Sequence, residues 1–152
     1  MRDVTLVFLR SEDNVLLGLK KRGFGANKWN GFGGKVHGEE TILQSAAREL
    51  HEEIGVVVSE DDLAAVGSIE FVFDHDDSWN QRAHVFFVTT WQGTPTESDE
   101  MIPQWFSLSE IPYEQMWIDD QYWLPQALRT GRVQAKFVFS EQGAVIREME
   151  LR

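Results

Sequence analysis

One stretch, residues 33–56, constrains the fold of this chain more than any other. It begins in a glycine loop and continues into a run whose apolar residues recur at helical spacing, namely Ala46, Ala47, Leu50 and Ile54. Thr41, with Gln44 three residues later, predicts a capping box at the start of a helix. Gly55 stands where a left-handed glycine would end it. The pattern therefore predicts a helix over residues 42–54 with one apolar face.

A second face of this helix is acidic. Glu49, Glu52 and Glu53 are three or four residues apart, so their carboxylates are expected on one side. Like charges at that spacing repel each other, which a purely structural helix would avoid. Carboxylates beside a glycine carbonyl, here that of Gly33, are hard oxygen ligands suited to Mg²⁺ or Mn²⁺. The alternative interpretation is a solvated acidic helix face.

The spacing of this stretch matches a known family pattern at every fixed position. The matched positions are Gly34, Glu40, Arg48-Glu49-Leu50, Glu52-Glu53 and Gly55-Val56. On these residues the segment resembles the Nudix hydrolases. The resemblance implies Mg²⁺-dependent hydrolysis of a nucleoside diphosphate linked to another group, and it leaves that group undefined.

Length and charge limit the remaining possibilities. A chain of 152 residues fits one domain, here residues 1–152, with a sizeable core. Zero cysteines exclude disulfides, thiolate metal sites and a cysteine nucleophile. Neither a leader peptide nor a run long enough to span a membrane is present, so we expect a cytoplasmic protein, and a monomer. A net charge of −11 argues against a nucleic-acid polymer as partner.

Local charge differs from this acidic average. Five of the fourteen Lys and Arg residues lie just before the acidic helix: Lys20, Lys21, Arg22, Lys28 and Lys35. Together with Mg²⁺, such a cationic cluster could offset the acidic background for a small anionic ligand. The alternative is a cluster that only improves solubility.

The rest of the chain predicts mainly strands. They are expected at residues 4–9, 15–20, 66–73, 83–91, 101–106, 133–139 and 144–151, with the last two forming a hairpin. A second helix is expected from Asp119 or Asp120 to Gly131, and residues 22–34 and 74–81 are expected to be loops. Mixed strands with two helices predict an α/β (α+β) fold. The family resemblance narrows this to a Nudix α/β/α sandwich with a mixed central sheet.

Further stretches resemble one branch of the family, the oxidised purine nucleoside triphosphatases related to MutT, and in particular the animal-type 8-oxo-dGTPase. They are residues 20–25, 29–35, 92–101 and 117–123. The resemblance implies that the base is held by Asn30, Trp117, Asp119 and Asp120, in a pocket lined by Phe24, Phe71, Phe73, Met101 and Trp123. Thr5 and Lys20 match neighbouring pocket and phosphate positions. Ile118 stands where a proline is expected, Gln81 replaces an apolar residue, and loop 74–82 has no match.

The chemistry of these residues suits a purine. A purine has two π-faces and a polar edge, so its pocket needs aromatic rings and fixed hydrogen-bonding groups. Adjacent Asp119 and Asp120, desolvated beside Trp117 and Trp123, should raise each other's pKa, so that one of them could donate a proton to the base. By moving that proton, the pair could accept 8-oxoguanine and 2-hydroxyadenine alike. The alternative is that one Asp only caps the second helix.

For the reaction, Glu52 and Glu53 with the Gly33 carbonyl are the first choice of Mg²⁺ ligands. Glu49 would be a ligand or the general base, Glu100 could complete the metal shell, and Arg48 would orient the glutamates. The resemblance implies attack of water on a nucleoside triphosphate, with release of monophosphate and pyrophosphate. The alternatives are a Nudix enzyme for dinucleotides such as ADP-ribose or NADH, and a non-catalytic nucleotide-binding module.

Overall fold

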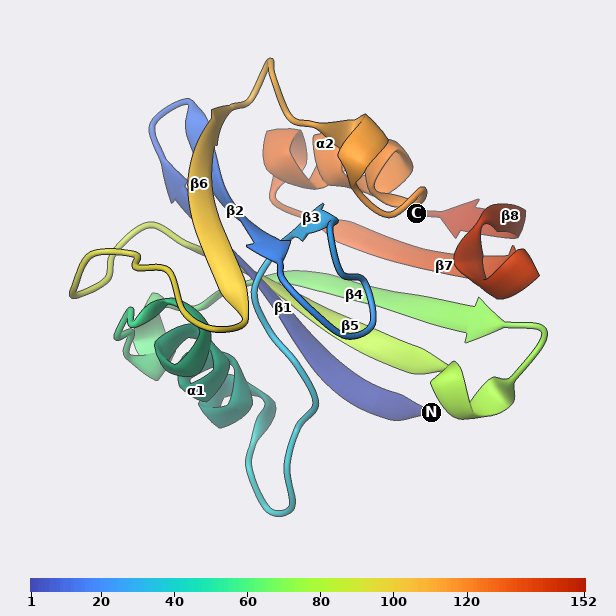
Figure 1. Cartoon of the computed structure of the whole chain (residues 1–152), viewed down its shortest axis with the longest axis horizontal. Coiled ribbons are helices and arrows are strands. Elements are labelled where there is room, and N and C mark those ends of the chain that lie inside the picture. Colours follow the sequence, from blue (N-terminus) through green and yellow to red (C-terminus); the bar gives the residue numbers. More distant parts are fainter.

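Eight strands form one mixed sheet in the computed structural model, which describes residues 1–152 (Figure 1). They are β1 (Arg2–Ser11), β2 (Asn14–Lys20), β3 (Trp29–Asn30), β4 (Ala64–Phe73), β5 (Gln81–Val88), β6 (Met101–Ser107), β7 (Val133–Ser140) and β8 (Val145–Leu151). Their order is β3-β2-β1-β5-β4-β7-β8, and β6 also pairs with β2. The pairs β1–β5 and β4–β7 are parallel and the other pairs are antiparallel. The expected mixed sheet and the C-terminal hairpin are both confirmed.

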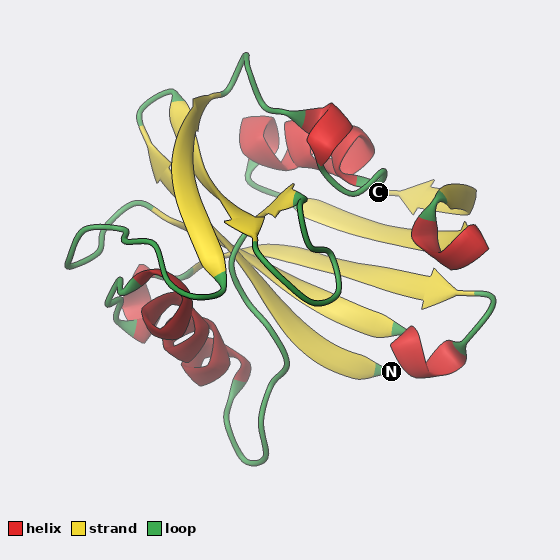
Figure 2. Cartoon of the chain, viewed as in Figure 1, coloured by secondary structure: helices red, strands yellow, loops and turns green.

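Two helices cover the two faces of this sheet (Figure 2). Helix α1 (Ile42–Ile54) and helix α2 (Asp120–Thr130) are joined to the sheet by separate hydrophobic cores. Alternate residues of β1 divide between them: Phe8 packs in the core that contains α2, while Val7 and Leu9 pack in the core that contains α1. The α/β/α sandwich expected from the sequence is therefore confirmed.

Both ends of α1 are built as the sequence predicts. The Thr41 hydroxyl accepts a hydrogen bond from the Gln44 N–H at 3.1 Å, and the Gln44 side chain accepts one from the Thr41 N–H at 2.9 Å. At the other end Gly55 adopts φ 72°, ψ 14°, and its N–H donates to the His51 carbonyl. These contacts satisfy backbone groups that a helix end leaves free, and they fix which residues α1 presents to each side.

Four short 3₁₀ turns complete the chain: η1 (Glu60–Asp62), η2 (Asp77–Trp79), η3 (Tyr113–Gln115) and η4 (Glu141–Gly143). The two-residue strand β3 lies inside the glycine-rich loop, where the sequence predicted no strand. Strand β5 runs from Gln81 to Val88, whereas the sequence predicted a strand over residues 83–91. Gln81 and Arg82 are polar yet fully in the sheet, because their backbones pair with β1 on one side and β4 on the other. No helix of the structure combines the length and apolar character needed to cross a membrane.

Candidate active site

A loop that runs beside β1 forms the first wall of the site. Backbone hydrogen bonds hold it there, with Val7 and Phe32 exchanging two bonds at 2.6 and 2.8 Å and the Thr5 N–H donating to the Gly34 carbonyl at 2.9 Å. At Gly33 the two backbones approach so closely that a Cβ would lie 1.9 Å from the Thr5 carbonyl oxygen. Only glycine can occupy this position without moving the loop.

Glu53 projects from α1 toward this loop and is buried, with 5% of its surface exposed. Its Oε1 accepts a hydrogen bond from the Gly33 N–H at 2.8 Å. Burial raises the pKa of the Glu53 carboxyl to about 8, the Gly33 hydrogen bond opposes this, and the charges of Glu49 and Glu100 add to the increase. A carboxylate that is buried beside two other acidic groups favours the binding of a proton or a cation.

Arg48 braces the acidic face of α1. Its Nε and Nη2 bind both oxygens of Glu40 at 2.6 and 3.0 Å, and its Nη1 lies 3.0 Å from Glu49 Oε1 and 3.1 Å from Glu52 Oε2. The Arg48 hydrogen bond lowers the pKa of Glu40 to about 2. The ion pairs predicted for Arg48 are therefore present, and they fix the side-chain directions of Glu49 and Glu52.

The three helix glutamates do not meet at one point. Glu53 faces Gly33, whereas exposed Glu52 turns toward Arg48, and no group of three or more His, Asp or Glu side chains is placed to hold a metal ion directly. The donors nevertheless fit a hard cation by their chemistry. Glu49 is held against Gly34, where a Cβ would lie 2.6 Å from its Oε1, and burial raises its pKa. The charges of Glu49 and Glu100 each raise the pKa of Glu53, a repulsion that a divalent cation would relieve.

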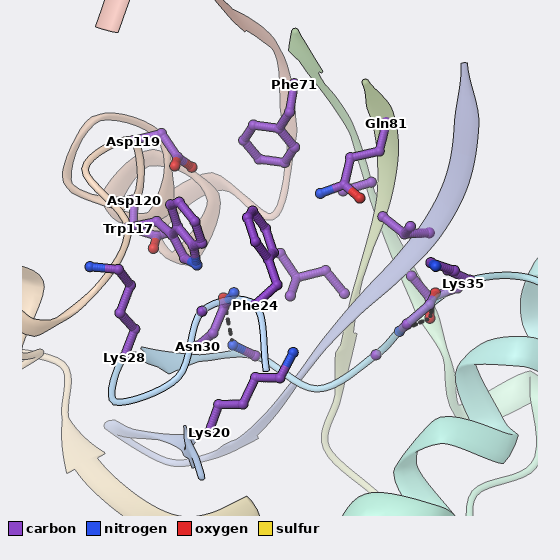
Figure 3. A pocket seen from close by; sticks show the side chains of 18 of the residues that line it. Lys20, Phe24, Lys28, Asn30, Lys35, Phe71, Gln81, Trp117, Asp119 and Asp120 are labelled. Atoms are coloured by element: carbon purple, nitrogen blue, oxygen red, sulfur yellow. Dashed lines mark hydrogen bonds between the residues drawn. The ribbon is translucent and has the colours of Figure 1, made fainter. Parts of the chain in front are cut away.

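A cavity of about 570 Å³ extends from Glu53 and Gly33 to the start of α2. The predicted residues that line it are Thr5, Lys20, Phe24, Asn30, Gly33, Glu53, Phe71, Phe73, Met101, Trp117, Asp119 and Asp120. Its volume suits a ligand of nucleotide size. Figure 3 shows the side chains of Phe24, Phe71 and Trp117 directed into it, with Lys20 and Lys35 toward the glycine loop.

Asp119 and Asp120 form the acidic end of this cavity, and only 2% and 3% of their surfaces are exposed. Burial raises the pKa of Asp119 to about 6, and burial together with the charge of Asp119 raises that of Asp120 well above its usual range. Asp119 occupies the N-cap position of α2, but its side chain makes no capping bond there. The Asp120 Oδ2 is buried without any hydrogen-bond partner in the protein. The capping alternative does not explain these side chains, because a buried oxygen without a partner is costly unless a ligand satisfies it.

Trp123 requires a correction, because the structure does not place it in the cavity wall. It is fully buried in the core beneath α2, and its indole N–H donates to Asp119 Oδ2 at 2.8 Å. One turn of helix separates the two residues, which brings their side chains together. Trp123 therefore orients Asp119 from the core side, and other residues form the surface that faces the base.

Aromatic side chains from three segments meet at the cavity mouth. Half-exposed Phe24 lies 5.0 Å, centroid to centroid, from both Trp79 and Trp117, and Lys28 Nζ lies 5.4 Å from the centre of a Trp117 ring. Trp79 belongs to η2, in the loop that the sequence left without a match. Sequence analysis also missed Arg2, Gln81 and Phe139 as lining residues. The alternation of β5 could have indicated Gln81, had that strand been started at the correct residue.

Of the other predicted site residues, Glu49, Glu52 and Glu100 lie outside the cavity wall, near the end of the cavity that contains Glu53.

The chain combines an α/β/α sandwich with an acidic helix held by Arg48, a glycine loop and a cavity of nucleotide size. This combination of fold and site is typical of one class of protein. Comparison with known proteins gives the family: a model described as the NUDIX domain matches residues 1–127. The chain belongs to the Nudix family.

Relatives and solved structures agree with this assignment. The oxidized purine nucleoside triphosphate hydrolase of Danio rerio is 47% identical over 143 residues, covering 94% of this chain and 90% of the relative. The protein of the same name from Mus musculus is 47% identical, covering 93% of this chain and 89% of the relative. Among solved structures, a MutT protein of Bacillus halodurans has a TM-score of 0.84 at 23% identity, covering 99% of this chain and 97% of that one. At that identity the structure supports the fold alone.

Proposed function

We propose that this protein is a Nudix hydrolase that cleaves oxidised purine nucleoside triphosphates, such as 8-oxo-dGTP and 2-hydroxy-dATP, to the monophosphate and pyrophosphate. Removing such triphosphates sanitises the nucleotide pool before polymerases use it. The zebrafish and mouse relatives carry the name of this activity and match nearly the whole chain.

The observation that carries the proposal is that one cavity joins two different chemistries. At one end, buried Asp119 and Asp120 with an unpartnered oxygen offer hydrogen bonds to a planar ring held among Phe71, Phe73 and Trp117. At the other end lie Glu53 and the glycine loop, with cationic Lys20 and Lys35 beside them. A nucleotide has the same division, an apolar base with a polar edge and an anionic phosphate chain.

The Mg²⁺ that Nudix chemistry requires would be held by Glu53, Glu49, Glu100 and the Gly33 carbonyl, with Glu52 retained as a predicted ligand. When bound, the ion supplies neutralisation of the phosphate charge that builds up during hydrolysis. The donor set fits this role because burial raises the pKa of both Glu49 and Glu53, and the charges of Glu49 and Glu100 add to the increase at Glu53.

The other residues of the proposed site bind and orient. Lys20 and Lys35 attract the phosphates, and Asn30, Trp117, Asp119 and Asp120 hold the base. Arg48 fixes Glu49 at 3.0 Å and is not itself a lining residue of the cavity. The alternative role of Glu49 is general base: if it does not ligate the ion, its carboxylate, whose pKa is raised by burial, is suited to accept the proton of the attacking water.

The proposal assigns the whole chain, residues 1–152, to one hydrolase domain. The C-terminal strands support this, because β7 pairs with β4 in the middle of the sheet although it follows the segment that the family model matches. A monomeric cytoplasmic protein whose partner is a small nucleotide is part of the same proposal.

The test is pyrophosphate release from a panel of nucleotides, with Mg²⁺ and with a chelator. We expect kcat/KM to be higher for 8-oxo-dGTP and 2-hydroxy-dATP than for dGTP, dATP and ADP-ribose, and activity to disappear with the chelator. Faster cleavage of ADP-ribose or NADH would replace the proposal with a dinucleotide pyrophosphatase. Tight binding without any cleavage would favour a nucleotide-binding module.

A further inference from the structure

Gln81 places an uncharged amide in the wall of the cavity, away from the aspartate pair. It is the first residue of β5, paired in register with Arg2 of β1 and Phe71 of β4. Residues directly opposite each other in a sheet share a face, so Gln81 points to the same side as Phe71, which is the cavity side. Figure 3 shows the Gln81 amide directed into the cavity from the side opposite Asp119, with the Phe71 ring between them.

The Gln81 amide has no partner of its own. It is half-buried, and its side chain makes no hydrogen bond to any protein group. Among the other hydroxyl and amide side chains of the wall, Thr5 Oγ1 contacts the Gly34 backbone and Asn30 Oδ1 accepts from the Gly31 N–H at 2.8 Å, which leaves the Asn30 amide nitrogen as a donor for the base. An amide carries two donors and an acceptor that lose water when the cavity fills, so an occupant must replace those bonds.

The proposed function requires a reason for the preference for the oxidised nucleotide, and an amide at this position can supply it. 8-Oxo-dGTP and dGTP carry the same groups on the edge that pairs with another base. Hydrogen bonds from Asp119 and Asp120 to that edge therefore give no reason to prefer the oxidised nucleotide. The two molecules differ on the opposite edge. Guanine has an N7 acceptor and a C8–H there, whereas 8-oxoguanine has an N7–H donor beside a C8 carbonyl.

We propose that Gln81 is a specificity-determining residue that reads the N7–H and C8 carbonyl edge of 8-oxopurines through a paired hydrogen bond from its carboxamide. This inference rests on the proposed function. The amide oxygen accepts from N7–H while the amide N–H donates to the C8 carbonyl. Unmodified guanine offers only the N7 acceptor on this edge, so at most one hydrogen bond can form, after the amide turns its N–H toward N7, and the paired arrangement is lost. Sites built to form a hydrogen bond discriminate strongly against an analogue that cannot form it.

The test compares discrimination between two substrates in matched variants. Gln81→Met keeps the length of the side chain and removes both hydrogen-bonding groups, while Gln81→Glu keeps the shape and removes the donor. Gln104→Met is the control, since Gln104 is exposed on β6 and lies outside the cavity wall. We expect the ratio of kcat/KM for 8-oxo-dGTP to that for dGTP to fall by about tenfold in Gln81→Met and to stay unchanged in Gln104→Met. Gln81→Glu keeps the acceptor for N7–H and faces the N7 lone pair of guanine with a carboxylate, so it should retain the preference for 8-oxo-dGTP while kcat/KM falls for both substrates. The kcat/KM for 2-hydroxy-dATP, which is unmodified at N7 and C8, should fall less than that for 8-oxo-dGTP.

The substrate provides a second measurement, one that needs only the wild-type protein if the variants do not fold. Methylation of 8-oxo-dGTP at N7 removes the donor that Gln81 is proposed to bind, and should lower kcat/KM in the wild type by about tenfold or more. In Gln81→Met this penalty should shrink. If the wild type prefers 8-oxo-dGTP and Gln81→Met keeps its full preference, the inference is overturned while the proposed function stands. If the wild type prefers unmodified triphosphates or ADP-ribose, both are wrong.

Discussion

Glu53 illustrates how a single residue can be unfavourable for folding and useful for binding. Its pKa is raised from the usual 4.5 to about 8, first by burial and then by Glu49 and Glu100. The folded protein therefore binds a proton at this site more tightly than the unfolded chain does. Stability from this group is complete at low pH and is lost as the pH rises from about 4.5 toward 8.

We predict that Glu53→Gln lowers turnover by on the order of a hundredfold or more and leaves the fold intact, because charge neutralisation at the phosphates is lost. Without metal, the same variant should be more stable than the wild type at pH 8, by about 1–3 kcal/mol, because a neutral amide has no proton to lose. Urea unfolding at pH 5 and pH 8 in chelator measures this. Glu39→Gln, at an exposed position before α1, is the control. An unchanged pH slope in Glu53→Gln would mean that another group causes the loss of stability.

Glu52→Gln tests a residue that the structure leaves apart from Glu53. The sequence predicts a metal ligand here, so turnover should fall by on the order of a hundredfold at saturating Mg²⁺. In the structure Glu52 is exposed and its Oε2 lies 3.1 Å from Arg48. Near-normal turnover would assign Glu52 to the ion-pair network around Arg48 and remove it from the metal site.

Asp119 and Asp120 should act on base recognition and leave the chemical step unaffected. We predict that replacing either by Ala weakens binding of 8-oxo-dGTP by about tenfold to more than a hundredfold, since a buried hydrogen-bonding group is lost. Asp119→Asn supplies a fixed donor and should affect 8-oxo-dGTP and 2-hydroxy-dATP unequally. The measurement is kcat/KM for both substrates from pH 6 to pH 9. Equal losses with an unchanged pH profile would show that the pair does not share a proton with the base.

At the scale of elements, features that depend on neighbouring residues could be predicted from the sequence, whereas the pairing of distant strands could not. Both caps of α1 could be predicted because each involves residues within four positions of one another. The parallel pairs β1–β5 and β4–β7 could not, since their partners are more than fifty residues apart and no local pattern specifies them. The polar first residues of β5 were not predicted as strand, because the strands that pair with them are also distant in sequence. Arg82 looks like a loop residue until Glu70 of β4, 3.2 Å away, is placed beside it.

The candidate site shows the same division. The pattern of residues 33–56 placed Glu53 beside Gly33 correctly, because loop and helix are adjacent in sequence. Trp79 could not be predicted from its own neighbours, and Gln81 only if β5 had been started at residue 81, since both reach the cavity when β5 docks between β1 and β4. Trp123 was wrongly placed in the wall because an aromatic residue one turn after Asp119 fits a pocket and a core equally well.

The capping box of α1 allows a prediction about this element alone. Thr41→Ala removes the acceptor for the Gln44 N–H and should lower the free energy of unfolding by about 1 kcal/mol. Thr41→Ser retains the hydroxyl and should lose much less. Chemical denaturation of the three proteins decides this, and identical midpoints would mean that the box contributes nothing to stability.

At the scale of the whole molecule, net charge and site charge are opposed. The chain carries −11 overall, yet Arg2, Lys20, Lys28 and Lys35 all line one cavity. The acidic surface disfavours nucleic-acid polymers, whereas the local cations suit a small polyanion. Lys20 and Lys35 lie at the same end of the cavity as Glu53, so a cation at the carboxylate and a phosphate chain at the lysines can bind next to each other.

This arrangement predicts that Mg²⁺ stabilises the whole fold, and more so at high pH. Near pH 6 an ion must displace the proton of Glu53, while above pH 8 the carboxylate is already free. At a concentration about a hundred times the Kd the stabilisation should approach about 2.7 kcal/mol. Thermal melts at pH 6 and pH 8.5, with NaCl matched for ionic strength, measure it. The shift should be absent in Glu53→Gln and retained in Glu39→Gln. A shift that Glu53→Gln retains would place the ion elsewhere.

The bond from the Trp123 indole to Asp119 also gives the cavity an optical reporter. We expect the emission of this fully buried indole to change when the carboxylate 2.8 Å from its nitrogen gains or loses a proton. The indole of Trp117 lies in the cavity wall, where we expect a stacked base to change its emission. Because the chain has six tryptophans, each of the two signals is obtained as the difference between the wild type and a variant. Comparing Trp123→Phe with Trp117→Phe would separate the two signals.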